Sequence, residues 1–436
     1  MISQDFKNIF GDDGFRCKYG EKFLTKQFLE IFSLEIAEFY KDKYGEVSCL
    51  IGIDTRHSGK LIYKTISRIL LSRGIKVIFL GITSSPEISY ILKKNKFNFG
   101  IMITASHNPY YDNGIKLFNK NGYKLKKYIE KQIEVKIKKK LKIKFEVKKS
   151  TVSNRSKSMV SLKKIYFDFL NSLLEKENNN KQKIIIDCSN GASSKLITKL
   201  FKKYNNIKII NNRPDGYNIN YKCGALHYKL LQQKLIKYKF DYGIALDGDA
   251  DRCILVDKKK GLIPSEKSLF ILLNVIKRKN KGKICASIIT NKALEKNIKQ
   301  RDMTLTHTQV GDRNVIERSI KLRASIGFEP SGHFYYPLLN NSMDGNITLI
   351  MIINFLSNNT LKQIIKLPHN KRIIFNMKSN LIDMPYKKLQ NSVNKIKLRK
   401  DEKLLLRKSI WDPVYRLYYD YNKISRFKVI RKKLKL

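Results

Sequence analysis

The chain is expected to fold as a multi-domain α/β protein. Short apolar runs alternate with segments of helical periodicity along most of its length, which is typical of mixed or parallel sheets with helices on both faces. Its 436 residues exceed what one hydrophobic core usually organises, and 42% of them are hydrophobic, which suffices for packed domains. We therefore predict three similar α/β domains with mixed sheets and a smaller C-terminal α+β domain.

The first domain is predicted over residues 1–155. The polar, lysine-rich stretch 124–157 is expected to link it to the second domain through a helix. The elements expected in the first domain are a strand at 49–53, a helix at 60–72, a strand at 76–80, a helix at 86–94 and a strand at 99–103.

The second domain is predicted over 156–254, the third over 255–366 and the fourth over 367–436, where the alternation weakens and the end becomes aromatic and basic. The elements expected in the second and third domains are strands at 183–187, 207–210, 242–246 and 253–256, helices at 193–203 and 228–238, and strands near 284–290, 305–310 and 324–329 with helices between them.

The charge of the chain is unusually positive, with a formal net charge of +51. Such a value would ordinarily suggest a nucleic acid or an anionic membrane as the partner. The lysines are spread over the whole length without a basic tail or a single basic helix. We therefore attribute the charge to composition and expect no nucleic-acid partner, although the positive field would favour capture of a small anion.

Neither a membrane segment nor a metal-binding or disulfide cysteine pattern is visible. No apolar run approaches the roughly 20 residues that cross a bilayer, and residues 1–10 lack the apolar core of a signal peptide. We expect a cytoplasmic protein without a membrane partner. The six cysteines are scattered without a Cys-x-x-Cys pair, which argues against a zinc site and a disulfide framework.

The run 101–118 contains a serine in a position that suits a catalytic residue. An apolar run that ends at Ile103 gives way to a polar loop with Ser106 beside His107. A loop or helix-capping serine is the alternative for this residue taken alone. However, the carboxyl end of a buried strand is where open α/β sheets bind ligands.

The loop 247–252 carries three carboxylates, Asp247, Asp249 and Asp251, directly after the expected strand 242–246. Carboxylates this close repel each other unless a cation lies among them, and oxygen ligands without Cys or His favour Mg²⁺. A solvated acidic turn is the alternative, but apolar strands enter and leave the loop. The spacing to a downstream glutamate that an EF-hand needs is missing.

These motifs carry a resemblance to a known family. The serine run closely resembles the phosphoserine loop of the α-D-phosphohexomutases. The segments 10–16, 52–59, 310–313 and 327–333 also resemble that family. Residues 110–116 and 214–220 resemble the bacterial phosphoglucosamine mutase branch. The resemblance extends over essentially the full chain and implies four domains around a central cleft.

The resemblance also implies an activity and a set of site residues. The activity would convert glucosamine 6-phosphate to glucosamine 1-phosphate through phosphorylated Ser106 and a sugar 1,6-bisphosphate, which also serves as activator. One Mg²⁺ would be held by a phosphoserine oxygen together with Asp247, Asp249 and Asp251. The other implied residues are Arg16, His107, Lys116, Arg252 and His333 for catalysis, and Arg313, Glu329, Ser331, Arg407 and Ser409 for substrate binding.

Two roles and two alternatives remain open at this point. Lys116 is the preferred carrier of the hydroxyl proton, provided that its pKa falls, and His333 is the second candidate. His107 is expected to support the loop. The alternative functions are a phosphomannomutase or phosphoglucomutase with the same mechanism, and a catalytically weakened homologue that binds sugar phosphates. The protein is expected to be a monomer or a homodimer.

The loop at residues 407–413 departs from the family. Members carry Arg-x-Ser-Gly-Thr-Glu-Pro, whereas this chain reads Arg-Lys-Ser-Ile-Trp-Asp-Pro. Arg407 and Ser409 could still bind a phosphate, with Lys408 as an additional cation. Ile410 replaces the glycine whose positive φ lets backbone N–H groups converge on an anion, and we expect weaker phosphate binding.

Overall fold

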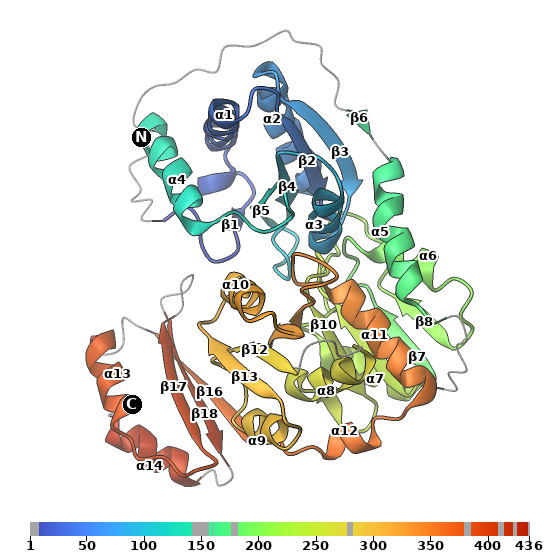
Figure 1. Ribbon diagram of the computed structural model, residues 1–436, viewed down its shortest axis with the longest axis vertical. Coiled ribbons are helices and arrows are strands. Elements are labelled where there is room, and N and C mark those ends of the chain that lie inside the picture. The colour runs from blue at the N-terminus through green and yellow to red at the C-terminus, as the bar shows by residue number, and fades with distance from the viewer. Residues whose placement is uncertain are drawn as a thin grey trace.

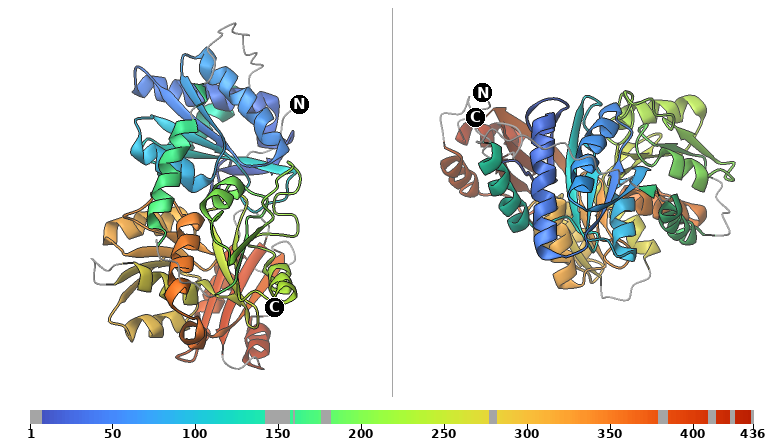
Figure 2. Two further views of the ribbon diagram at one scale, coloured as in Figure 1. Left: turned by 90° about the vertical axis from the view of Figure 1, so that its right-hand side faces the viewer. Right: turned by 90° about the horizontal axis from the view of Figure 1, so that it is seen from above.

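A computed structural model describes residues 8–141, 157–158, 160–175, 182–276, 282–378, 385–408, 414–421 and 425–434. Four sheets follow one another along the chain (Figure 1). Each sheet with the helices that cover it is called a unit below, numbered from the N-terminus. The first unit occupies one end of the molecule, and the other three gather at the opposite end (Figure 2). Within the described residues, no helix has the length and apolarity needed to cross a membrane.

The first unit contains a six-stranded mixed sheet in the order β1-β5-β4-β2-β3-β6. Helices α1, α2 and α4 pack on one face and α3 and α5 on the other. The elements are β1 (Phe15–Lys18), η1 (Lys22–Leu24), α1 (Lys26–Lys43), β2 (Ser48–Ile53), α2 (His57–Ser72), β3 (Lys76–Ile82), α3 (Ser85–Lys94), β4 (Phe99–Ile103), β5 (Asp112–Asn119), α4 (Lys127–Leu141), β6 (Lys157–Ser158) and α5 (Val160–Leu173).

Two local features of the first unit matter for the site. All five residues of β4 are buried, as expected of a central strand covered on both faces. Helix α3 begins at a capping box, in which the Ser84 hydroxyl accepts the Glu87 N–H and the Glu87 carboxylate accepts the Ser84 N–H. The capping box fixes Ser85 at the first position of the helix.

The second unit contains a five-stranded sheet in the order β11-β10-β9-β7-β8. β7, β8 and β9 are parallel, and β10 returns antiparallel to β9. Its elements are β7 (Ile184–Asp187), α6 (Ser194–Leu200), β8 (Ile207–Ile210), α7 (Tyr228–Tyr238), β9 (Tyr242–Leu246), β10 (Cys253–Asp257) and β11 (Gly261–Ile263).

The third unit contains a four-stranded sheet in the order β13-β12-β14-β15. The third and second sheets contribute to one continuous hydrophobic core, which α8 and α11 complete. The elements are α8 (Ser265–Val275), β12 (Lys283–Ser287), α9 (Ala293–Lys299), β13 (Thr304–Thr308), α10 (Asp312–Leu322), β14 (Ile326–Glu329), β15 (His333–Tyr335), α11 (Gly345–Asn358) and α12 (Lys362–Lys366).

The fourth unit is a smaller α+β arrangement, as predicted. Its three antiparallel strands lie in the order β16-β18-β17, and α13 and α14 share a hydrophobic core with them. The elements are β16 (Lys371–Lys378), α13 (Tyr386–Asn394), β17 (Lys403–Lys408), β18 (Val414–Tyr421) and α14 (Ser425–Lys433).

The predicted fold class is thereby confirmed, while the four domain ranges stay a prediction. Two strands lie across the predicted limits. β6 pairs with β3 in the first sheet although it follows residue 155. β10 spans the limit at 254/255 and belongs to the second sheet, because its antiparallel pairing with β9 continues through Asp257.

Candidate active site

The loop after β4 buries the hydroxyl of Ser106 at the junction of the first and second units. Only 1% of Ser106 is exposed, and its φ is +52°. Its N–H donates to Thr104 Oγ1 at 2.9 Å, and its hydroxyl donates to Asp247 Oδ2 of the second unit at 2.8 Å. The serine predicted from the sequence therefore lies directly against the predicted acidic loop.

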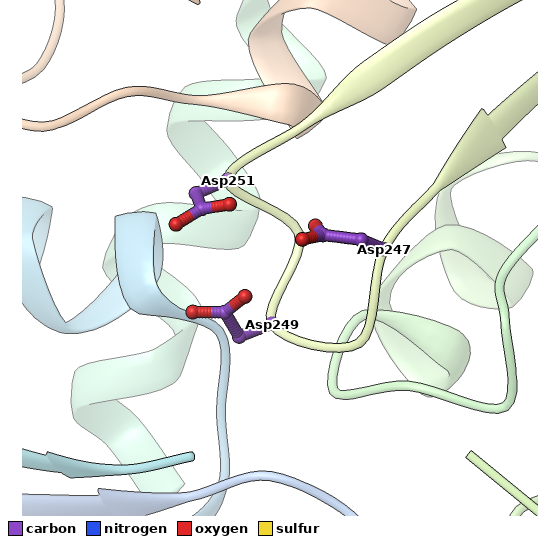
Figure 3. Close-up of side chains that lie close together, drawn as sticks. All are labelled: Asp247, Asp249 and Asp251. Carbon is purple, nitrogen blue, oxygen red and sulfur yellow. The ribbon is translucent and has the colours of Figure 1, made fainter. Parts of the chain in front are cut away.

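Three carboxylates of the loop between β9 and β10 turn toward a common space (Figure 3). Asp247, Asp249 and Asp251 are all buried, and one oxygen of each lies within 4.8 Å of the others. Burial raises the pKa of Asp247 to about 7, and the neighbouring Asp251 and Asp249 add to this shift. Among the described residues, Asp249 Oδ1 is a buried oxygen without a hydrogen-bond partner.

The donor set suits a hard divalent cation. Carboxylate oxygens without nitrogen or sulfur ligands are what Mg²⁺ prefers. The unpartnered Asp249 oxygen, and the raised Asp247 pKa in a cluster of like charge, are features that a bound cation would relieve. The residues present therefore fit the predicted Mg²⁺.

Lys116, on β5, reaches into the acidic cluster from the first unit. Its ammonium lies 2.7 Å from Asp249 Oδ2, 2.9 Å from Asp251 Oδ2 and 2.9 Å from Asp13 Oδ2. Burial works against the charge on Lys116, but these three carboxylates outweigh it and hold the pKa well above the ordinary value. The lowered pKa that Lys116 would need as a proton carrier is therefore not found.

Asp13 and Ser85 complete the cluster and were not identified from the sequence. Asp13 pairs with Arg16 and with Lys124, and these cations together with Lys116 hold its pKa well below the usual range despite burial. The Ser85 hydroxyl donates to Asp249 Oδ2, and its N–H donates to the Asp249 carbonyl at 3.0 Å. Their partners in the cluster, Lys116 for Asp13 and Asp249 for Ser85, lie far away in sequence, so that no local pattern marks either residue as part of it.

Two histidines and two arginines surround the serine and the acidic loop. His107 Nδ1 lies 3.4 Å from Ser106 Oγ, and burial, with Arg252 and Arg16 nearby, lowers the pKa of His107 to about 2. A pKa this low keeps His107 neutral, which suits the supporting role expected of it. On the same loop, the Ala105 carbonyl accepts a hydrogen bond from Arg16 Nη1 at 3.3 Å.

His333, at the start of β15, connects the third unit to the acidic loop. Its Nε2 lies 3.2 Å from Asp251 Oδ1 and 3.2 Å from Arg252 Nε, and its Nδ1 lies 2.8 Å from Ser331 Oγ. Burial lowers the pKa of His333, but Asp251 outweighs burial and raises it overall. Glu329 approaches the same ring, at 3.8 Å from Nδ1.

The remaining predicted substrate residues lie farther out. The Arg313 guanidinium pairs with Glu130 on α4, at 2.8 and 3.0 Å, rather than with the serine cluster. It lines a cleft of about 620 Å³ between α4 and α10 together with Lys126 and Lys127. Arg407 lies on β17 of the fourth unit, and Ser409, with the rest of the divergent loop at 409–413, lies outside the described residues.

The arrangement suits phosphoryl transfer. A buried hydroxyl lies against a site for a divalent cation, and fixed cations from Lys116, Arg16 and Arg252 surround it. Catalysis of phosphoryl transfer consists mainly of positioning and of stabilising the charge on the transferred group.

Comparisons with known proteins agree with this reading. Three family models match the chain: phosphoglucomutase/phosphomannomutase α/β/α domain I over residues 7–144, domain II over 164–261 and domain III over 264–370. The phosphoglucosamine mutase of Caldicellulosiruptor bescii is 34% identical over 348 residues, which are 79% of this chain and 77% of that protein.

Solved structures share the whole fold. A phosphoglucomutase/phosphomannomutase family protein from Burkholderia thailandensis matches with a TM-score of 0.80 at 18% identity, covering 98% of this chain and 96% of that one. A structure of Aspergillus fumigatus N-acetylphosphoglucosamine mutase in complex with glucose 1,6-bisphosphate matches with a TM-score of 0.63 at 15% identity, covering 98% and 94%.

Proposed function

The chain belongs to the phosphoglucomutase/phosphomannomutase family of the α-D-phosphohexomutases, and from this premise we propose that it is a phosphoglucosamine mutase. It is an intramolecular phosphotransferase that interconverts glucosamine 6-phosphate and glucosamine 1-phosphate. The observation that carries the proposal is the Ser106 hydroxyl, which lies 2.8 Å from a carboxylate of the acidic loop. The identity to phosphoglucosamine mutases over most of the chain supports the amino sugar as substrate.

The reaction begins from an enzyme that carries a phosphoryl group on Ser106. The bond between phosphorus and the serine oxygen breaks, and a new bond forms to the 1-hydroxyl oxygen of glucosamine 6-phosphate. The resulting 1,6-bisphosphate then turns around in the site. Its 6-phosphoryl group returns to Ser106, and glucosamine 1-phosphate leaves. A trace of sugar 1,6-bisphosphate activates the enzyme because it phosphorylates Ser106 directly.

Mg²⁺ would be held by Asp247, Asp249, Asp251 and an oxygen of the phosphoserine. When bound, it supplies positive charge that offsets the negative charge developing on the phosphoryl oxygens. Arg16 and Arg252 add fixed positive charge from the first and second units. His107 stays neutral beside the serine and supports its loop.

The hydroxyl proton needs a carrier, and His333 suits this role better than Lys116. The three carboxylates that surround the Lys116 ammonium keep it protonated, so that it acts as a fixed cation. A histidine ordinarily titrates near neutrality, and Asp251 raises the pKa of His333 above that ordinary value. Hydrogen bonds orient its ring beside the acidic loop. It takes the proton from the sugar hydroxyl and returns it to the leaving oxygen.

Substrate binding falls to the third and fourth units. Glu329 and Ser331, which flank His333, bind the hydroxyl groups of the sugar ring. Arg407 and Ser409 bind the phosphate that does not react, and Arg313 contributes from the cleft beside α10.

The test is mutase turnover with Mg²⁺ and a trace of sugar 1,6-bisphosphate, comparing the 6-phosphates of glucosamine, mannose and glucose. We expect a clear preference for glucosamine 6-phosphate, and no turnover by Ser106→Ala with any sugar. Activity confined to the neutral sugars would overturn the substrate while leaving the mechanism. Normal turnover by Ser106→Ala would overturn the mechanism.

A further inference from the structure

The backbone carbonyls of the serine loop are bound by side chains from two different units. Arg56 of the first unit donates from Nη2 to the carbonyls of Ser106 and Asn108, each at 2.9 Å. Asn220 of the second unit donates from Nδ2 to the same two carbonyls, at 2.8 and 3.0 Å. Two independent donors thus hold each carbonyl, and one of the two comes from across the junction between the units.

The serine needs such support because its backbone is strained. Ser106 has a φ of +52°, and a non-glycine residue in the left-handed region costs roughly 1 kcal/mol or more. This conformation determines where the Cβ and hydroxyl point. A fixed Ser106 carbonyl fixes the following peptide plane, and therefore helps to keep the hydroxyl aimed at Asp247.

The backbone of the acidic loop lies directly against the Ser106 carbonyl. A Cβ added to Gly248 would lie 2.5 Å from the Ser106 oxygen and 2.9 Å from Asn220 Nδ2. In the opposite direction, Ser85 of the first unit binds both the carboxylate and the carbonyl of Asp249. Each unit therefore holds the reactive loop of the other, and a displacement of the serine loop is also a displacement from the carboxylates.

Asn220 is placed for this task and engaged in little else. It is buried, its N–H donates to the Ser189 carbonyl at 2.9 Å, and its amide Nδ2 has the two serine-loop carbonyls as partners. Its own φ is +57°, a region that Asn and Asp tolerate better than most residues. The side chain thus reaches the serine loop from a turn whose backbone is held by the Ser189 carbonyl.

We propose that Asn220 is a positioning residue for the phosphoryl-accepting serine, which it holds in register with the acidic loop by binding the Ser106 and Asn108 carbonyls from the second unit. This inference rests on the proposed function. The Asn220 amide Nδ2 binds the backbone carbonyls of the serine loop and not the Ser106 hydroxyl. Its loss should therefore lower kcat while it changes KM for the sugar phosphate little.

Asn220→Asp is the sharpest test, because it replaces an NH₂ donor with an oxygen that faces two carbonyl oxygens and keeps size and backbone preference. Asn220→Gly removes the side chain where glycine tolerates the positive φ. Asn218→Asp is the matched control, because it makes the same chemical change in the same turn, where Asn218 Nδ2 donates to the Arg213 carbonyl at 3.0 Å.

The measurements are kcat and KM with glucosamine 6-phosphate, the fraction of Ser106 phosphorylated by sugar bisphosphate, and the thermal melt. We expect kcat to fall roughly 100-fold in both Asn220 variants, as a displacement of about 1 Å would cause, with KM within about threefold and the melt preserved. Asn218→Asp should match the wild type.

Failure of this inference and failure of the proposed function give different results. An active wild type with unchanged kcat in both Asn220 variants would overturn the positioning role alone. Loss of the melting transition in both variants would also overturn it, since Asn220 would then serve folding. A wild type without turnover would overturn the proposed function and this inference with it.

Discussion

The junction between the first and second units differs in kind from the junction between the third and fourth. At the first junction, loops exchange hydrogen bonds within a few ångströms of the candidate nucleophile, from Ser106 to Asp247 and from Asn220 to Ser106. At the second, polar contacts join the ends of elements away from that centre, such as Lys292 N–H to Asp420 at 2.8 Å and Lys403 to the Thr290 carbonyl at 2.9 Å.

This difference indicates how the fold divides its tasks. The first junction sets the distance between the serine and the carboxylates, which phosphoryl transfer requires to be constant. The second attaches a unit with its own hydrophobic core, which carries the predicted phosphate-binding Arg407. Changes at the first junction should therefore affect the chemical step, and changes at the second should affect local stability and substrate binding.

The largest expected effect comes from removing the cation that the first junction is built to hold. Treatment with EDTA should lower turnover by roughly 1000-fold, because several kcal/mol of charge stabilisation are lost, and added Mg²⁺ should restore it. Turnover assays before and after chelation measure this, with circular dichroism as the control for folding. Full activity in EDTA would contradict the role given to Asp247, Asp249 and Asp251.

Gly248→Ala tests how closely the two loops must approach. The added Cβ would lie 2.5 Å from the backbone carbonyl oxygen of Ser106, a distance that forces one loop to move. We expect kcat to fall roughly 100-fold. Gly45→Ala is the control, since a Cβ there meets nothing within 4 Å and kcat should not change. Equal kinetics for the two variants would show that the approach of the loops does not matter.

Arg372→Met tests the other side of the comparison. Arg372 donates to both oxygens of Asp420, which is 1% exposed, and removal of one partner of a buried pair costs about 3 kcal/mol. Hydrogen exchange should accelerate in β16 and β18 while β4 and β9 keep their protection. Arg68→Met, which removes an exposed partner of Glu30, should cost less than about 1 kcal/mol. Equal acceleration of hydrogen exchange in β4 would contradict the difference drawn between the two junctions.

The smallest expected effect is a pH dependence of stability that comes from Asp344, which caps α11 behind the acidic loop. Burial raises the pKa of Asp344 from 3.8 to about 6, so that the folded chain keeps a proton there that the unfolded chain loses. The stability contribution of this group is full below pH 4 and is lost as pH rises toward 6.

Urea unfolding of the wild type and Asp344→Asn at pH 4.5 and pH 7 measures this contribution. Relative to the variant, the wild type should lose about 2 kcal/mol of unfolding free energy between the two pH values. A constant difference between the proteins would mean that Asp344 titrates near its ordinary pKa.

The fold and the central residues of the site could be predicted because their signals are local. Buried strands such as β4 and β9 appear as apolar runs, and the serine and acidic loops follow them directly. Ser85 and Asn220 could not be predicted in the same way, because their partners lie on another unit and become neighbours only after the units pack together. Asp13 could not be predicted because its partner Lys116 lies far away in sequence within the same unit.

Two of the predicted site residues have charged partners that their motifs do not indicate. Lys116 has a raised pKa because Asp13 and the acidic-loop residues Asp249 and Asp251 converge on it from two places in the chain. Arg313 turns to Glu130 because the first turns of α4 and α10 meet in the folded chain. Motifs identified which residues gather, whereas the electrostatics depends on which charges each of them meets.

The most direct test of the account follows the phosphoryl group itself. The protein is phosphorylated with glucose 1,6-bisphosphate that carries heavy oxygen in its phosphoryl groups, mixed with excess unlabelled glucosamine 6-phosphate and quenched, and the peptide that carries Ser106 is weighed by mass spectrometry. We expect the labelled phosphoryl group on Ser106 before mixing, its replacement by an unlabelled one on the timescale of turnover, and the label in glucosamine 1-phosphate. Label on another residue, or label that stays on Ser106 while product forms, would contradict the mechanism.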